Sequence, residues 1–141
     1  MSVYLYHKGY FDRSKKYEPR LAPLRALVED EISPGWQERY NRWQVVESEM
    51  ARGYYCQWTS LLCLLSEFNP QEPCYQFTVE EMRVIRDRLA AAVKNPQSCL
   101  SSRINESCYW RFSPDQIHNT AQWALEIFEN GLRDNVLLYL A

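Results

Sequence analysis

The chain has 141 residues, of which 46% are apolar and 24% charged, a balance typical of globular proteins that excludes a disordered chain. Sixteen basic and eighteen acidic residues give a net charge of −2, so the composition does not favour a nucleic-acid binder held by phosphate contacts. Five tryptophans and ten tyrosines raise the aromatic share to 14%. At this length, a single domain covering residues 1–141 is expected.

The N-terminal quarter predicts a strand, a loop and a helix. Residues 2–7 alternate aliphatic with aromatic side chains, which is typical of a short strand. Residues 8–18 are polar and basic and are predicted to form a loop. Leucines at helical spacing follow Pro19 and continue to Val28. Since Pro23 removes an internal hydrogen bond, the regular part of this helix is expected to begin there.

A long aromatic and apolar pattern follows. Ser33 and Pro34 fit the N-cap and the first position of a helix. Gly53 is the natural break in the pattern, because glycine inside a helix costs about 1 kcal/mol relative to alanine. Two helices are therefore predicted, over residues 35–51 and 54–68, and the second is expected to be central to the core.

Capping boxes at residues 78–81 and 113–116 begin two further helices. The first is expected to end at Asn95 and the second at Asn130–Gly131, where glycine would supply a left-handed stop. Between them, the Ser-rich stretch 96–112 is predicted to be an irregular connection.

The final apolar segment, residues 136–140, predicts a buried strand. Two short strands at the ends of the chain would be stable only if they paired and were covered by helices. The predicted fold is therefore mainly α, with about five helices in a single compact domain and a small sheet formed by the N- and C-terminal segments.

The cysteine pattern favours free thiols. Five cysteines, an odd number, include no C-x-x-C pair, so neither a metal nor another cofactor is predicted. Cys56 and Cys63 would lie two turns apart on one face of the helix predicted over 54–68, packed as small apolar side chains. Free thiols, no leader segment and no apolar stretch long enough to span a membrane predict a cytoplasmic protein.

One pair of residues could support catalysis. His118 follows Asp115 by three residues in the first turn of the last predicted helix, where a carboxylate could orient an imidazole base. Arg111 is a third candidate for such a site. The same pair is ordinary on a solvated helix surface, and the common nucleophile and nucleotide motifs are absent from the sequence. A small-molecule-binding protein or small enzyme using His118 and Asp115 is therefore kept as an alternative.

Charge and aromatic residues suggest a protein-binding surface instead. Residues 1–25 carry six basic and two acidic residues, and Trp36, Tyr40 and Trp43 form an aromatic stripe on the helix predicted over 35–51. Large aromatics also fill cores, so the stripe fits either role. Trp, Tyr and Arg dominate binding hot spots. The residues predicted to bind a partner are Trp36, Arg39, Trp43, Arg13, Lys15 and Lys16.

These observations favour a non-enzymatic protein-binding module of the inhibitor type, such as a bacterial immunity protein, an antitoxin or a phage-encoded blocker. It would act by occluding a partner protein, for example a toxin or a host-defence or effector enzyme, and the acidic remainder of the chain suits a basic partner. A structural subunit of an assembly is a second alternative. No membrane partner is predicted.

Overall fold

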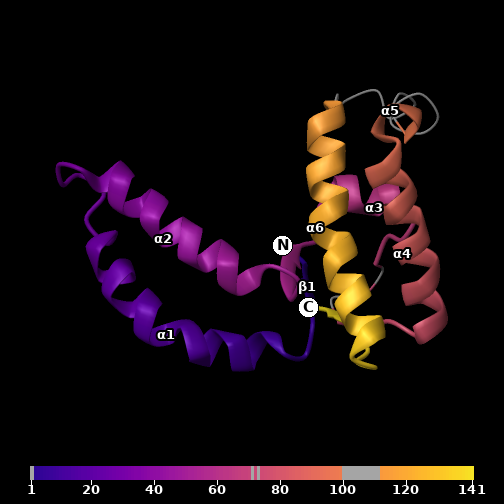
Figure 1. The fold of residues 1–141 in the computed structure, drawn as a ribbon, viewed down its shortest axis with the longest axis horizontal. Helices are drawn as coiled ribbons and strands as arrows, with labels where there is room; N and C mark the ends of the chain where they lie inside the picture. Colours follow the sequence, from indigo (N-terminus) through magenta and orange to yellow (C-terminus); the bar gives the residue numbers. More distant parts are fainter. Residues whose placement is uncertain (1, 71, 73, 100–111) are drawn as a thin grey trace. The chain divides into compact units, whose positions relative to one another are not determined.

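A computed structural model describes residues 2–70, 72, 74–99 and 112–141. The chain divides into two compact units, which we call the body (residues 1–8 and 53–141) and the hairpin (residues 9–52). The body holds four strands and four of the six helices in the described part of the chain, and the hairpin holds the other two (Figure 1). The candidate Arg111 lies outside the described residues.

The strands of the body form one antiparallel sheet in the order β2-β1-β4-β3. Within it, Leu5 pairs with both Cys56 and Leu140, so the N- and C-terminal segments are joined as predicted. The strands are short, and Phe77 extends the pairing by donating its backbone N–H to the carbonyl of Leu138 over 2.9 Å. Their bounds are β1 Tyr4–Tyr6, β2 Tyr55–Gln57, β3 Tyr75–Gln76 and β4 Tyr139–Leu140.

Alternation along the strands gives the sheet two different faces. Leu5 and Leu140 are fully buried in the core on one face. On the other, the ring of Tyr6 lies between those of Tyr55 and Tyr139, with centroid distances of 5.1 Å and 5.3 Å. The sheet is therefore apolar on its core face and aromatic on its outer face.

The helices of the body follow the predicted capping signals. Both capping boxes are present, at Thr78 with Glu81 and at Ser113 with Gln116. α4 and α6 run side by side (Figure 1). α5 is a single helical turn, so the prediction of an irregular connection over residues 96–112 is wrong for residues 96–99, and residues 100–111 of that connection lie outside the described part of the chain. The bounds are α3 Ser60–Ser66, α4 Val79–Lys94, α5 Pro96–Cys99 and α6 Pro114–Arg133.

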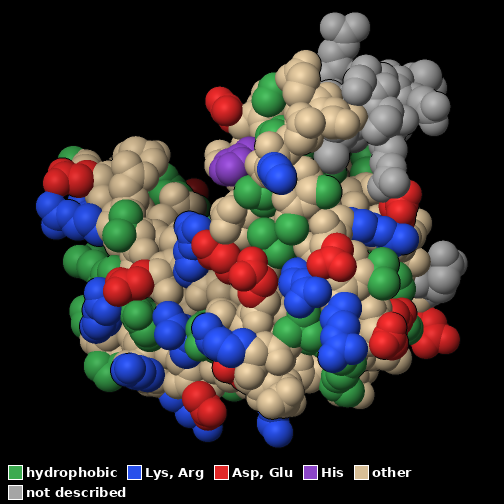
Figure 2. Space-filling view, turned by 45° about the vertical axis from the view of Figure 1, so that its right-hand side comes forward, with side chains coloured by type: hydrophobic (Ala, Val, Ile, Leu, Met, Phe, Trp, Pro, Cys, Tyr) green, Lys and Arg blue, Asp and Glu red, His purple; other side chains and the backbone are tan. Residues whose placement is uncertain are grey.

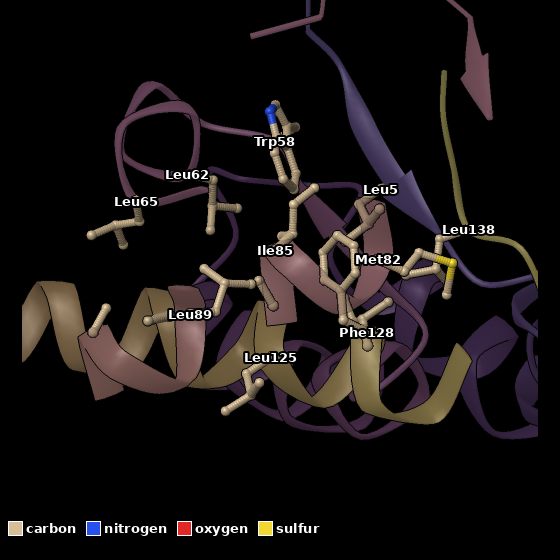
Figure 3. Close-up of a cluster of buried hydrophobic side chains, with 14 of the residues drawn as sticks. Leu5, Trp58, Leu62, Leu65, Met82, Ile85, Leu89, Leu125, Phe128 and Leu138 are labelled. Carbon is tan, nitrogen blue, oxygen red and sulfur yellow. The ribbon is translucent and has the colours of Figure 1, made fainter. Parts of the chain in front are cut away.

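The core lies between the apolar face of the sheet and α3, α4 and α6 (Figure 3). Phe77 and Phe128 are fully buried, with ring centroids 5.5 Å apart. The ring centroid of Trp58 lies 6.1 Å from that of Phe77 and 6.3 Å from that of Phe128. The apolar stripes of α4 and α6 are buried, and α3 belongs to the core as expected for the helix predicted over residues 54–68. The mainly α fold with a small sheet from the chain ends is confirmed.

The hairpin consists of α1 (Tyr10–Leu27) and α2 (Trp36–Ala51). The prediction of a loop over residues 8–18 is wrong, because α1 begins at Tyr10 and contains both Pro19 and Pro23. Both prolines are exposed, so water can satisfy the carbonyl groups that lose their helical partners, and α1 bends along its length (Figure 1).

Two further boundaries differ from prediction. Ser33 does not cap α2; Gly35, at φ 78°, takes the N-cap position, and the Ser33 hydroxyl donates to the carbonyl of Asp30 instead. The chain does break at Gly53, at φ 83°, but residues 54–57 are not helical. They form β2, because pairing with β1 satisfies their backbone groups. Cys56 therefore does not share a helix face with Cys63.

The predicted stop of α6 at Gly131 is also wrong. The helix continues to Arg133, and Asn135 takes the left-handed conformation at φ 56°. Val136 donates its N–H to the carbonyl of Gly131, and Asn135 donates to Leu132, which is a Schellman ending with asparagine in the glycine position. Gly131 serves close packing instead: a Cβ there would lie 2.8 Å from Met82 Cε and 2.9 Å from Leu138 Cδ2.

Gly131→Ala tests this packing role. Crowding a well-packed core costs about 1–3 kcal/mol, and the gain in helix propensity offsets about 1 kcal/mol of that cost. We therefore expect a net loss of about 1 kcal/mol in the free energy of unfolding, measured in urea. Asn119→Ala, at an exposed position of α6, is the matched control and should be neutral or stabilising. A stabilised Gly131→Ala variant would contradict the close packing.

Candidate functional site

The connection between the two helices of the hairpin, residues 28–35, is held by a dense set of hydrogen bonds, and we call it the tip loop. The indole Nε1 of Trp36 donates to the carbonyl of Val28 over 2.9 Å. The backbone N–H of Ile32 donates to the carboxylate of Asp30 over 3.2 Å, and the Ser33 hydroxyl donates to the Asp30 carbonyl over 2.8 Å. The conformation of the tip loop is therefore fixed by its own side chains together with the first residue of α2.

Arg39 completes this arrangement from the first turns of α2. Its guanidinium donates to the carbonyls of Leu27 at 2.9 Å and Pro34 at 2.7 Å, and to the hydroxyl of Ser33. Arginine suits this position because its N–H donors point in a fixed fork. The residue predicted to touch a partner thus acts within the hairpin, where it clamps both ends of the tip loop.

The side chain that the tip loop presents to solvent is Ile32, which is 95% exposed. Sequence reasoning missed it. The available signal was an isoleucine that follows three acidic residues and precedes a Ser-Pro-Gly turn, where no core position is expected. Glu29, Asp30 and Glu31 are also exposed. The tip loop therefore places one large, almost fully exposed aliphatic side chain next to negative charge.

The aromatic stripe lies along one face of α2. Trp36 stacks on Tyr40 with a centroid distance of 4.8 Å, and Tyr40 lies 5.7 Å from Trp43. All three are half-buried, as is Glu47 one turn further on. The pKa of the Glu47 carboxyl is raised above its ordinary value, because the effect of burial exceeds the opposite effect of the nearby Arg25.

The basic candidates lie at the other end of the hairpin. Arg13 donates to the carbonyls of Met50 and Glu49, both over 2.9 Å, at the end of α2 where carbonyls lack helical partners. Lys15 and Lys16 are exposed on α1. Trp36 and Arg39 stand at the start of α2, roughly 20 Å away along a 16-residue helix. The structure therefore does not gather the six predicted residues into one patch.

The candidate catalytic pair is on the surface of the body. His118 and Asp115 are both exposed, and His118 Nδ1 lies 3.1 Å from the carbonyl of Val93. Another histidine has a carboxylate partner: His7, only 4% exposed, donates from Nε2 to Asp134 Oδ2 over 3.1 Å. No local pattern could predict this pair, since the two residues come from opposite ends of the chain. Because His7 is buried, we assign this pair a structural role, in which it holds the end of α6 against β1.

The described residues contain neither a group of side chains that could hold a metal ion nor a cysteine in a reactive environment. No three His, Cys, Asp or Glu side chains among them lie close enough to hold a metal ion. Of the cysteines described with their side chains, Cys56, Cys63 and Cys74 are free, and burial raises the pKa of the Cys56 thiol to about 12. That thiol is therefore protonated and unreactive at neutral pH.

Charge and hydropathy of the described surface bear on possible partners. On the face shown in Figure 2, basic and acidic side chains are interspersed, with apolar ones between them, so this face carries no field of one sign. Within the described part of the chain, every helix is too short or too polar to cross a membrane. The cytoplasmic location stays a prediction.

Comparisons with protein-family models, curated proteins and solved structures give no match to this chain.

The clamp formed by Arg39 can be tested by Arg39→Met, which keeps an apolar stem and removes the donors. We expect the free energy of unfolding to fall by about 1–2 kcal/mol, and the backbone amide of Ile32 to become more mobile in NMR relaxation. The matched control is Arg42→Met, which breaks an exposed pair with Glu38 and should change stability by less than about 0.5 kcal/mol. Equal effects of the two variants would contradict the clamp.

The link between His7 and Asp134 predicts a dependence of stability on pH. The pKa of the Asp134 carboxyl is below its ordinary value of 3.8. The largest cause is the hydrogen bond from Arg133, and the hydrogen bond from His7 lowers the pKa further. The charged carboxylate therefore contributes stability that is complete above pH 3.8 and is lost as the pH falls through the lowered value. In thermal melts, wild type should be more stable than Asp134→Asn at pH 7, and the gap should close towards pH 2. A gap that is constant with pH would contradict this role.

Proposed function

We propose that the chain is a non-enzymatic protein-binding module of the inhibitor type, which occludes a partner protein with the tip loop of its hairpin. The observation that carries the proposal is Ile32, almost fully exposed on a loop whose backbone is fixed by hydrogen bonds. A rigid loop loses little conformational entropy when it binds, so its apolar contact is converted efficiently into affinity.

Exposed apolar residues concentrate on the hairpin. Among the described residues, the four most exposed large hydrophobic side chains are all on this unit: Ile32, Val45, Phe11 and Leu27. Leu27 is the last residue of α1, directly before the tip loop, and is 51% exposed. An apolar end on a two-helix hairpin is suited to fill a pocket on a partner's surface.

The charge around Ile32 specifies the partner's chemistry. Glu29, Asp30 and Glu31 precede it and are exposed, so the complementary surface is an apolar pocket with a basic rim. Basic rims of this kind occur where proteins bind phosphates, as in nucleases and nucleotide-handling enzymes. An acidic inserted loop would both fill such a pocket and neutralise its charge, which is a direct route to inhibition.

The test begins with the partner captured from native lysate, identified by mass spectrometry and purified. Affinities of wild type and Ile32→Asp are then measured by calorimetry. We expect Ile32→Asp to weaken binding by roughly thirty-fold or more, the effect of losing a central hot spot. Reversing the charge of Glu29 and Glu31 should slow association and reduce its salt dependence. Activity of the partner should recover in parallel with the loss of binding.

Matched controls separate this surface from the others. Val45→Asp on α2 and Val84→Asp on α4 place the same charge at other exposed apolar positions and should stay within about threefold of wild type. His118→Ala should do the same. The proposal is wrong if Ile32→Asp binds like wild type, or if His118→Ala abolishes function in a folded protein.

A further inference from the structure

A groove on the body is lined by arginines and by apolar side chains, and it is separate from the surface proposed on the hairpin. It lies between the first turns of α4 and the last turn of α6, with residues 135–137 along one side, and has a volume of about 520 Å³. This is within the range of about 300–1,000 Å³ that small-molecule sites occupy. Three arginines line it, Arg83, Arg86 and Arg133, against a single acidic residue, Glu129.

The groove also has an apolar lining. Val79 and Leu137 are 42% and 37% exposed, two of only seven large hydrophobic side chains exposed to this degree in the described chain. Met82 and Val136 lie beside them. Gly131 lines the same groove and has no room for a side chain, so its backbone forms part of the wall. The site therefore offers apolar surface and guanidinium groups side by side.

The three guanidiniums have carboxylate neighbours. Arg83 lies 3.7 Å from Glu80, Arg86 lies 3.1 Å from Asp87, and Arg133 lies 3.1 Å from Asp134. Glu80 and Asp87 are largely exposed, and exposed pairs of this kind contribute little to stability. Each guanidinium has five N–H donors, so it can bind a ligand oxygen while it keeps its carboxylate partner.

We propose that this groove binds a small organic anion that carries an apolar group, of the class of the aromatic carboxylates. The carboxylate would bind the guanidiniums in the bidentate geometry that arginine favours, and the ring would cover Val79 and Leu137. Neither a bare inorganic anion nor a neutral aromatic molecule would use both halves of the groove. The proposal concerns the body alone and does not depend on the function proposed for the hairpin.

Three probes of graded chemistry test the proposal on the full chain, by NMR titration of the backbone amides. 1-Naphthoate has both features, 1-naphthamide lacks the charge, and acetate lacks the ring. We expect 1-naphthoate to bind with a Kd of roughly 1 mM or below, and the other two at least about tenfold more weakly. The shifts should centre on residues 79–86 and 131–137.

Variants then assign the site. Arg83→Gln and Arg133→Gln should each weaken 1-naphthoate binding by roughly threefold or more, and Leu137→Asp should weaken it similarly. The matched control is Arg42→Gln on the hairpin, which removes an exposed, ion-paired arginine and should leave the Kd unchanged. Thermal melts confirm that each variant is folded. Shifts elsewhere on the chain, equal affinity for the amide, or a Kd indifferent to Arg83→Gln and Leu137→Asp would each overturn the proposal.

Discussion

The pairing of β1 on both of its sides is the constraint on which the rest of the body depends. Leu5 pairs with Cys56 on one side and with Leu140 on the other, and its side chain is fully buried in the core. This three-residue strand therefore unites the beginning of the chain, the segment after the hairpin and the C-terminal segment. His7, directly after it, adds the hydrogen bond to Asp134 that fixes the end of α6. The groove lies next to that helix end, and the hairpin is the chain segment that connects β1 to β2.

The parts of the fold that could be predicted from sequence are those whose physics is local. Both capping boxes form as expected, because the residues that satisfy each other are three positions apart. The helix over residues 10–18 could not be predicted from its basic composition, since α1 is stabilised by packing against α2. The sequence predicts a helix where β2 forms, because the partner strand β1 is separated from it by the whole hairpin in the sequence. It predicts a helix stop at Gly131, because the contacts of Gly131 with Met82 and Leu138 are tertiary.

The candidate sites show the same division. The sequence predicts that Arg39 and Trp36 on α2 bind a partner. In the fold both donate hydrogen bonds to the tip loop and its ends, and only the folded hairpin shows which side chain that loop presents. The arginines of the groove come from α4 and from the end of α6, and no spacing in the sequence connects them. The spacing of Asp115 and His118 predicts a carboxylate beside an imidazole, but in the fold His118 faces the carbonyl of Val93, and His7 has the carboxylate partner.

The distance along the chain between the paired strands has a consequence for the order of folding. β1 can pair with β4 only when nearly the full length of the chain has been brought together, whereas α1 with α2, and α4 with α6, are close in sequence. Contacts between distant segments form slowly, because closing the intervening chain costs conformational entropy before the new contacts contribute any favourable free energy. We therefore expect the helical pairs to form early and the sheet to close last. Until it closes, the outer tyrosines and the edges of β1 would be open to other chains, so we expect aggregation to be most favoured at that stage.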